Sequence, residues 1–562
     1  MSLRTSLGAR VALVVLFLCA LAAAQAAERR PQQAAIASAY PLATAAGMEI
    51  LDHGGNAFDA AVAVSAALAV VEPKGSGPGG GGFYLLHRSA DGSDILVDAR
   101  EVAPLAATRD MFLDAKGDIV AGLSTNSALA AGIPGEVAGW AHLASRYGRL
   151  PLARSLAPAI RLARQGFPLY PQLRESMVAK LPQFSKTPDG RRIYLLRGAA
   201  PPEGYILKET DLARTLEIIA RDGADGFYRG PLAKKLVDGV KKLGGIWTPE
   251  DLAGYRVVER RPLIGEYRGA RIITTPPPSS GGIALIGSLN ILSGYDVATL
   301  DSTTRKHLII EALRRVHRDR AEYLGDPDFV TIPLERLLSP YYAAGQRTSI
   351  RLDRATPSDT LPGYTSSAGG TQTTHFSVLD RDGNRVAGTI TLNAWFGSGL
   401  VVAGTGVILN NEMDDFAIKP GAPNIYQLVG AEANAVAPRK RPLSSMTPTF
   451  VEGPRGVLII GSPGGSFIPT MVLLGTLNWI DGASAADIVS APRFHHQYEP
   501  DLVFAEDGAF TAEERAGLER RGHSIRRWPG SIGNLQVVTW DYATGTVSAA
   551  SDPRRAGGSL VK

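Results

Sequence analysis

Cysteine is almost missing from this chain of 562 residues, because Cys19 is the only one. A single cysteine excludes an internal disulfide framework, a cysteine-rich zinc site and an iron–sulfur cluster. A strong excess of one charge sign is missing as well, since 59 Lys and Arg stand against 54 Asp and Glu. The basic residues lie among acids, which argues against a nucleic-acid-binding face. The length predicts two domains or one large layered unit.

Long apolar runs are also missing, apart from one near the N-terminus. Met1–Ala26 contains two arginines, an acid-free apolar run over Val11–Leu21 and the small-x-small pattern Ala24-Gln25-Ala26. These are the three parts of a secretory leader, and the run is short for a membrane span. The alternative is an uncleaved membrane anchor. We expect a signal peptide over residues 1–26 that takes Cys19 with it, and an exported protein, periplasmic or secreted, without stable membrane association.

The first part of the remaining chain has the signals of two successive helices. Pro41–His53 ends at Gly54-Gly55, a typical helix stop. Asn56 can cap the next helix, Ala57–Val71, whose first turn carries an acid that favours the positive helix end. Alanine and valine occupy nearly every side of this second helix, so we expect it to be buried.

Helical and strand patterns alternate through the rest of the chain. Residues 136–262 look helical with breaks, and further helices are predicted over Ile283–Leu292, Arg305–Tyr323 and Pro469–Leu477. The strand candidates are Phe83–His87, Ile95–Asp98, His375–Leu379, Arg385–Thr391, Val401–Val407, Thr449–Val451, Val457–Ile460 and Gln536–Asp541, with a hairpin signal at Asp380–Asn384. Helical sequence on both sides of these strands predicts a layered α/β protein with a β-rich middle.

Thr373 stands between two very different segments. Ala355–Thr371 is rich in Pro, Gly, Ser and Thr and has little periodicity, which is typical of a mobile connector, whereas a strand is predicted directly afterwards. A threonine hydroxyl is a weak nucleophile that needs a base, and peptide cleavage before the threonine would supply its own α-amine. Such cleavage needs flexible chain before the threonine and a rigid strand after it. An ordinary threonine before a strand is the plain alternative.

Two glycine-rich runs could present backbone N–H groups to an anion. Gly75–Gly82 lacks the Lys-Ser/Thr of a P-loop and the spacing of a dinucleotide fingerprint, so it predicts a tight turn packed against other chain. Gly461–Ser466 follows an apolar strand and precedes a helix, where adjacent glycines suit an oxyanion or a carboxylate. At this second run, an ordinary turn without a binding role is an equally good interpretation.

Two clusters of polar side chains could hold a ligand. His495 and His496 are neighbours, and on a strand they point to opposite faces, so a structural role is favoured over a metal site. The acidic run Asn410–Phe416 could bind a cation, hold the ammonium group of a substrate, or lie on the surface.

Together these motifs resemble those of the γ-glutamyltranspeptidase family of N-terminal-nucleophile hydrolases, across nearly the whole mature sequence. The most specific ones are Thr373–Ser377, Asn410–Phe416, Arg441–Met446, Gly461–Ser466 and Pro492–Gln497, supported by Val71–Pro73, Gly79–Phe83, Asp98–Pro104, Pro134–Val137, Pro276–Gly282 and Tyr323–Phe329. Their joint presence in this order favours the catalytic interpretation of Thr373. The resemblance implies a four-layer αββα fold, with two stacked antiparallel sheets between helical layers.

The resemblance also implies self-cleavage of the Gln372–Thr373 bond. The products would be a large subunit of residues 27–372 and a small subunit of residues 373–562, which together form one interleaved domain and a heterodimer. Thr373 would then hold both the nucleophilic hydroxyl and the base, its new α-amine. Thr391 matches a hydroxyl that orients the nucleophile, and Gly464 and Gly465 match the backbone donors of the oxyanion hole.

On the substrate side, the resemblance implies a pocket for a γ-glutamyl zwitterion. Arg100, Ser444 and Ser445 match groups that bind the α-carboxylate, for which an arginine fork is well suited. Asn393, Glu412 and Asp415 match the groups around the α-ammonium. Tyr426, within the loop of residues 419–430, matches an aromatic that covers the pocket as a lid.

The implied activity is that of a γ-glutamyltransferase or glutathione hydrolase that needs no metal and no organic cofactor. Thr373 would attack the γ-amide of glutathione or a related compound, and the γ-glutamyl ester would pass to water, an amino acid or a dipeptide. A related cephalosporin or glutaryl acylase of the same fold is one alternative. An exported, non-enzymatic amino-acid-binding protein that uses the same pocket is another.

Overall fold

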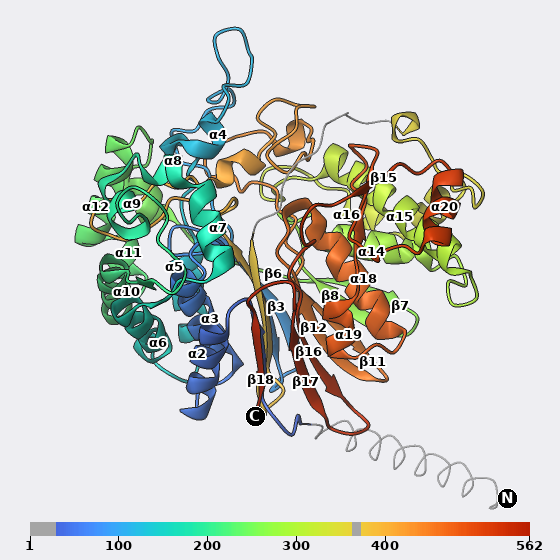
Figure 1. The fold of residues 1–562 in the computed structure, drawn as a ribbon, viewed down its shortest axis with the longest axis horizontal. Helices are drawn as coiled ribbons and strands as arrows, with labels where there is room; N and C mark the ends of the chain where they lie inside the picture. The colour runs from blue at the N-terminus through green and yellow to red at the C-terminus, as the bar shows by residue number, and fades with distance from the viewer. Residues whose placement is uncertain (1–29, 362–372) are drawn as a thin grey trace, which may run out of the picture.

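The computed structural model describes residues 30–361 and 373–562. The predicted signal peptide of residues 1–26 and Gln372, on one side of the predicted cleavage bond, lie outside the described residues. Two antiparallel sheets face each other at the centre, and helices cover their outer faces (Figure 1). This arrangement confirms the predicted αββα fold.

The first sheet has seven strands in the order β18 (Gly558–Val561), β1 (Ala35–Ser38), β9 (Thr374–Leu379), β10 (Arg385–Thr391), β2 (Gly81–Arg88), β3 (Ser93–Ala99) and β6 (Val258–Arg260). The second has six, β17 (Val547–Ser551), β16 (Gln536–Asp541), β12 (Gly456–Gly461), β11 (Thr449–Gly453), β8 (Ala270–Thr274) and β7 (Leu263–Tyr267). Smaller sheets join β13 (Phe494–His495), β14 (Val503–Ala505) and β15 (Ile525–Arg527), and β4 (Phe167–Pro168) with β5 (Ile206–Leu207). Both large sheets combine strands from before and after Thr373, so the two parts of the chain interleave.

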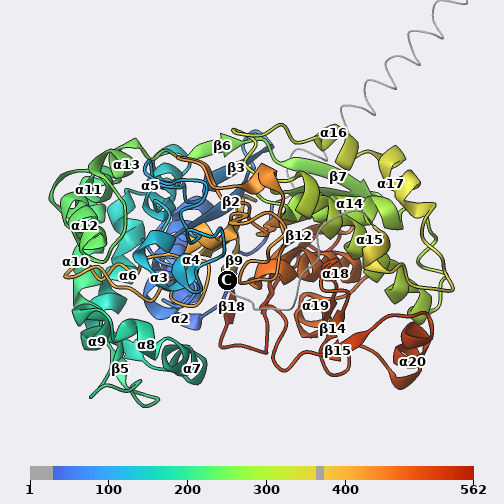
Figure 2. The same ribbon diagram turned by 90° about the horizontal axis from the view of Figure 1, so that it is seen from above.

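The helical layers lie on opposite sides of the sheets (Figure 2). One layer contains α2 (Pro41–Asp52), α3 (Ala57–Val71), α5 (Glu136–Arg146), α6 (Leu152–Gln165), α7 (Pro171–Ala179), α8 (Leu181–Phe184), α9 (Pro188–Tyr194), α10 (Thr210–Asp222), α11 (Asp225–Tyr228), α12 (Gly230–Lys242) and α13 (Pro249–Gly254), with the short α4 (Leu123–Asn126) above it. The other contains α14 (Gly281–Leu292), α15 (Ser302–Tyr323), α16 (Leu334–Leu337), α17 (Pro340–Arg347), α18 (Ile468–Ile480), α19 (Ala485–Ser490) and α20 (Ala512–Arg520).

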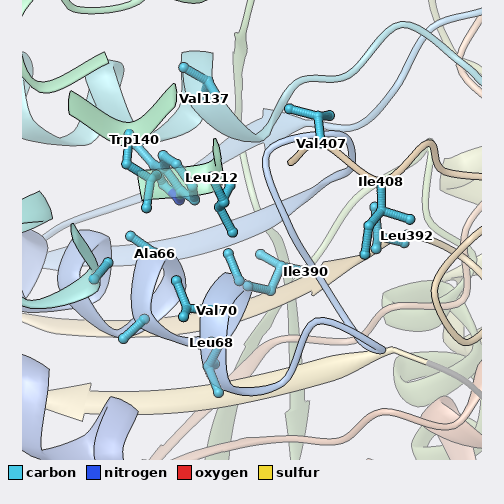
Figure 3. Close-up of a cluster of buried hydrophobic side chains, with 14 of the residues drawn as sticks. Ala66, Leu68, Val70, Val137, Trp140, Leu212, Ile390, Leu392, Val407 and Ile408 are labelled. Atoms are coloured by element: carbon cyan, nitrogen blue, oxygen red, sulfur yellow. The ribbon is translucent and has the colours of Figure 1, made fainter. Parts of the chain in front are cut away.

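Helix α3 is the centre of the first helical layer and is buried along its whole length. The Asn56 side chain accepts from the backbone N–H groups of Phe58 and Asp59, and Asp59 caps Asn56 in return, as the sequence predicted for the start of this helix. Leu68 and Val70 of α3 belong to the same core as Ile390 of β10 (Figure 3). Full burial of each such side chain stabilises the fold by about 1.5–3 kcal/mol, so α3 holds β10 firmly in place.

The register of β9 and β10 brings two threonines to one edge of the first sheet. Thr389 pairs with His375 and Ile390 pairs with Thr374. Because the strands are antiparallel, Thr391 at the end of β10 comes opposite Thr373, directly before β9. The fold therefore places both predicted hydroxyls at one end of the sheet.

Several sequence predictions are wrong in detail. Residues 401–407 are not a strand: left-handed backbone at Gly404 and Gly406 folds them into a turn, and Val401 and Ile408 form only an isolated bridge. The part of the chain predicted to be helical over residues 136–262 also contains β4, β5 and β6. The mobile connector stays a prediction: the backbone N–H groups of Thr356 and Ser358 near its start donate to Glu311 and Asp501, and its residues 362–371 lie outside the described residues.

Among the helices of residues 30–361 and 373–562, none combines the length and the apolar character needed to cross a membrane.

Candidate active site

One small cavity gathers nearly all the residues that the sequence singled out. Its lining comprises Arg100, Thr373, Thr391, Asn393, Glu412, Asp415, Tyr426, Leu428, Ser444, Ser445, Met446, Gly465 and Ile468. Gly464, the remaining predicted residue within the described chain, directly precedes Gly465. Segments far apart in the sequence therefore converge where β9 and β10 meet.

Thr373 lies at the entrance to β9 and is half-buried. Its hydroxyl lies 3.5 Å from that of Thr391. The Thr391 oxygen accepts from the backbone N–H of Asn393 at 2.8 Å, so the Thr391 proton is free to be donated to Thr373. The φ of Thr373 is 148°, a costly conformation for a β-branched residue. The geometry fits a nucleophile held by Thr391 at a strained backbone position.

The side chains lining the cavity include no histidine and no lysine in the part of the chain that the structure describes. His375, two residues after Thr373, is fully buried and its Nδ1 lies 2.8 Å from the Thr389 hydroxyl. Burial lowers the pKa of His375 to about 3. This imidazole is therefore a neutral structural group of the sheet and not a base beside the Thr373 hydroxyl.

The turn after β12 presents Gly464 and Gly465 at the start of a helix. Gly464 has a φ of 143° and Gly465 has a φ of 55°, and the short helix η5 (Gly465–Phe467) leads into α18. A Cβ on Gly465 would meet the ring of Tyr426. Both positions therefore require glycine, and the turn opens into the cavity near Thr373.

Arg100 lies directly after β3 and is only 1% exposed. Its guanidinium donates to Glu412 and, at 2.6 Å, to Asp415 Oδ2, and its Nε donates to the Pro442 carbonyl at 3.2 Å. A carboxylate oxygen of Glu101 lies 3.7 Å from the same guanidinium. Three carboxyl groups thus surround one arginine. Because the acids outnumber the cation, a further positive charge would be attracted to this cluster.

Burial disfavours the charged forms of these acids. Burial raises the pKa of Glu412 to about 8; Asp415 also raises it, while Arg100 lowers it. Burial likewise raises the pKa values of Asp415 and Glu101. Burial alone would lower the pKa of Arg100, but the surrounding carboxylates raise it above its ordinary value. The cluster therefore carries a proton that an incoming cation can displace.

Ser444 and Ser445 also line the cavity. Ser444 is fixed by its backbone, which donates to the Pro278 carbonyl and accepts from the N–H of Ser280, both at 2.8 Å. The serine-rich loop before α14 thus holds the serine pair of the later motif in position.

The loop over residues 419–430, predicted to be a lid, contributes Tyr426 and Leu428 to the lining of the cavity. The Tyr426 hydroxyl donates to the Asn393 carbonyl at 2.8 Å, and this tyrosine is 4% exposed. Asn393 has a φ of 71° and its side-chain amide donates to the Asn411 carbonyl at 2.9 Å. The backbone N–H of Ile425 donates to Asp414 at 2.9 Å, so the loop is tied to the acidic run.

The comparisons with known proteins agree with this geometry. The family model described as gamma-glutamyltranspeptidase matches residues 43–561. This chain belongs to the gamma-glutamyltranspeptidase family. It is 44% identical to the glutathione hydrolase proenzyme of Escherichia coli (strain K12) over 93% of this chain and 91% of the relative. It is 37% identical to the acylase ACY 1 proenzyme of Pseudomonas sp. (strain SE83), over 91% and 90%.

Solved structures show the same fold. Cephalosporin acylase from Bacillus halodurans superposes with a TM-score of 0.83 at 31% identity, covering 94% of this chain and 96% of that one. A chain of Helicobacter pylori gamma-glutamyltranspeptidase gives a TM-score of 0.57 at 41% identity, covering 58% of this chain and 94% of that one. Members of the gamma-glutamyltranspeptidase family and cephalosporin acylases thus share the architecture.

Two residues near the site of this gamma-glutamyltranspeptidase family member were missed in the sequence. Glu101 directly follows Arg100, and neither of its carboxylate oxygens has a hydrogen-bond partner among the described residues. Arg320, on α15, is buried, donates to the Val429 carbonyl of the lid at 3.3 Å and is attracted by Asp415. Glu101 lies within the quoted motif Asp98–Pro104, which was a signal available from the sequence. Arg320 needed the tertiary fold.

The two adjacent histidines have structural partners, as predicted. His495 contacts the Thr470 hydroxyl at 2.8 Å and the Gln497 side chain at 2.9 Å, and His496 contacts Asp501 at 3.1 Å. The acidic run is buried at Asn410–Asp414, so its interpretation as a surface segment is wrong.

Proposed function

We propose that this chain is an exported, self-processing γ-glutamyl transferase/hydrolase. The observation that carries the proposal is the placement of Thr373 beside Thr391, at a cavity whose charged groups suit a zwitterion. Cleavage between Gln372 and Thr373 would separate residues 27–372 from residues 373–562. It would also free an α-amine at Thr373, whose hydroxyl has no histidine or lysine beside it among the described residues that line the cavity.

The proposed cycle starts when the Thr373 oxygen attacks the γ-carbonyl of the donor and its proton passes to the α-amine. The backbone N–H groups of Gly464 and Gly465 are suited to hold the oxyanion of the tetrahedral intermediate. Collapse breaks the C–N bond and protonates the leaving amine, which leaves a γ-glutamyl ester on Thr373. Water then releases glutamate, or an amino acid or dipeptide takes the acyl group as a new amide.

The charges of the cavity support a γ-glutamyl donor. Arg100 with Ser444 and Ser445 can bind the α-carboxylate, while Glu412, Asp415 and Asn393 can hold the α-ammonium. A donor without an ammonium group would leave Glu412 and Asp415 without the cation that favours their carboxylate forms. Tyr426 would close the site over the bound donor.

A cephalosporin or glutaryl acylase is the second candidate, favoured by the superposition on cephalosporin acylase. A glutaryl group has the γ-type acyl chain but no α-ammonium, so Glu412 and Asp415 argue against it. Turnover of a γ-glutamyl anilide should therefore exceed that of the matched glutaryl anilide. Preference for the glutaryl compound would replace the first candidate with the second.

The processing step is tested on the exported protein and on a Thr373→Ala variant. The wild type should give two bands in denaturing electrophoresis, with Thr373 at the amino end of the smaller. The Thr373→Ala protein should stay as one folded chain without turnover, whereas Thr374→Ala at the next position should still be cleaved. An uncleaved wild type after prolonged incubation, or turnover by Thr373→Ala, would refute the proposal.

A further inference from the structure

A second charged cluster lies beside the first residue of β9, outside the lining of the cavity. It consists of Glu72, directly after α3, Lys74 two residues later, Thr374, and Arg555 between β17 and β18; these four are called the Glu72 cluster below. Glu72 is 5% exposed and Lys74 is 3% exposed, and each acts on the pKa of the other, as Arg555 does on both. The charged groups that follow α3 and β17 therefore lie close to one another and to the Thr374 hydroxyl.

The Glu72 cluster contacts β9 through a glycine. Glu72 Oε2 and Thr374 Cβ each lie 3.2 Å from the point where a Cβ on Gly75 would stand. The Lys74 carbonyl accepts from the backbone N–H of Phe396 at 2.9 Å, which ties the cluster to the loop after β10. The predicted tight turn of Gly75–Gly82 thus packs the Glu72 carboxylate near Thr374, the residue directly after Thr373.

Several buried polar atoms of this region have no hydrogen-bond partner among the described residues, namely Glu72 Oε2, Ser76 Oγ, Thr374 Oγ1 and Arg555 Nε. Buried polar groups are nearly always paired in folded proteins, so such a concentration asks for an explanation. It arises next to Thr373, where cleavage would create a new ionisable group. Unpaired charges at that place act on the new group through their fields.

That new group is the α-amine of Thr373, and its protonation decides whether the enzyme works. An ordinary α-amine has a pKa of about 7.7–8.0, so it is largely protonated at neutral pH and unable to accept the nucleophile's proton. A nearby carboxylate favours the protonated amine, and nearby cations favour the neutral one.

We propose that Glu72 and Lys74 are positioning residues for the amino group of Thr373, with opposite effects on its charge. The Glu72 carboxylate holds the amino end near β9, and Lys74 with Arg555 keeps it in the neutral form that serves as the base. The inference rests on the proposed function, because the amino group exists only after cleavage before Thr373.

Other charged groups face the same region and stay constant in the experiment. Glu175 of α7, Tyr170 and Tyr40 lie near Lys74 and Glu72. Arg100, Glu412 and Asp415 lie in the cavity. Burial raises the pKa of Glu72, while Lys74, the Thr374 hydroxyl and Arg555 lower it. Burial lowers the pKa of Lys74 to about 8, so Lys74 is mostly charged below that pH.

The test compares the pH dependence of kcat/KM for a γ-glutamyl anilide in processed Glu72→Gln and Lys74→Met enzymes between about pH 5 and 9, since the acid limb reports the free enzyme's base. Glu72→Gln should move the acid limb to lower pH, and Lys74→Met should move it to higher pH, each by about 0.5–1.5 pH units. The double variant should return toward the wild-type profile. A purely structural role would lower activity without opposite shifts.

Matched controls remove similar charges elsewhere. Glu209→Gln changes a buried glutamate that accepts a hydrogen bond from Tyr194 in the helical layer. Lys306→Met removes a lysine near the start of α15 that pairs with Glu514 of α20. Both should keep the wild-type acid limb. If either moves it as much as the cluster variants do, the inference falls.

Shifts of Glu72→Gln and Lys74→Met in the same direction, or no shift in either, would overturn the inference while leaving the proposed function intact. Failure of the wild type to cleave or to turn over would instead remove the proposed function. If the Glu72→Gln protein is not cleaved before Thr373, the acid limb of Arg555→Met is measured in its place. Arg555→Met should move the acid limb in the same direction as Lys74→Met, and an unchanged or opposite profile would again overturn the inference.

Discussion

Arg100 donates to Asp415 across 2.6 Å, so the arginine expected to bind the substrate carboxylate is itself held by an acid expected to bind the substrate ammonium. Glu412 accepts from the same guanidinium. The two halves of the predicted zwitterion site are therefore one network. A γ-glutamyl ligand adds one carboxylate beside Arg100 and one ammonium beside the acids, which redistributes these contacts without adding net charge.

Binding of glutamate near neutral pH should release about one proton, because Glu412 with its pKa of about 8 is mostly protonated in the free site. The ligand ammonium favours the carboxylate and lowers that pKa. Calorimetric titrations in buffers of different ionisation enthalpy measure the release. Glu412→Gln should abolish it, whereas Glu432→Gln, which removes an exposed acid paired with Arg109, should not. Proton uptake by the wild type would contradict the prediction.

Gly465→Ala should reduce kcat by at least about 100-fold, since it disturbs the turn suited to hold the oxyanion. The new Cβ would meet the Tyr426 ring, and a φ of 55° strains any residue other than glycine. Steady-state kinetics with a γ-glutamyl anilide measure the loss. Gly345→Ala is the matched control, because nothing lies within 4 Å of its added methyl on α17. That variant should keep full activity, and equal losses in both would refute a specific role for the turn.

Local signals in the sequence were enough to place the strands and helices that carry the site. The Asn56 cap and the unbroken apolar run predicted α3 with its observed bounds, and the Asp-Gly turn predicted β10 as observed. The turn at Val401–Val407 was missed because its β-branched residues favour a strand, while two glycines with left-handed backbone decide the outcome. Strand β1 was missed because Ala35–Ser38 is short and gains its stability from β9 and β18, which are far away in the sequence.

In the candidate site, too, some features follow from local sequence and others only from the tertiary fold. Residue types that match a motif, such as Thr373 and Gly465, could be chosen from the sequence alone. The ion pairs between Arg100 and its acids could not, because they join segments more than 300 residues apart. Arg320 is one of several buried arginines on α15, and its contact with the Val429 carbonyl, which only the tertiary fold shows, distinguishes it from the others.

Tyr426→Phe should weaken closure of the lid by about 1 kcal/mol, the usual value of one neutral hydrogen bond, because it removes the bond to the Asn393 carbonyl. We expect the dissociation rate of bound glutamate to rise about fivefold, with kcat less affected. Stopped-flow displacement measures this rate. Tyr341→Phe changes a tyrosine that is 89% exposed and should leave the rate unchanged. Slower dissociation from Tyr426→Phe would show that the loop does not act as a lid.

His375 should stabilise the fold above pH 6.5 and lose that contribution in acid. Its folded-state pKa of about 3 lies below the ordinary value of 6.5, so the neutral ring favours the folded state, and the contribution falls as pH decreases toward 3. His375→Gln should cost about 2 kcal/mol at pH 7.5, since it loses the contact with Thr389. Below pH 6.5 the difference from wild type in the free energy of unfolding should shrink by about 1.4 kcal/mol per pH unit.

Urea unfolding in the Thr373→Ala background, where one chain is expected, measures both proteins at pH 7.5, 6 and 5. The partly exposed His142→Gln serves as control, and a difference for His375→Gln that stays constant with pH would contradict the prediction.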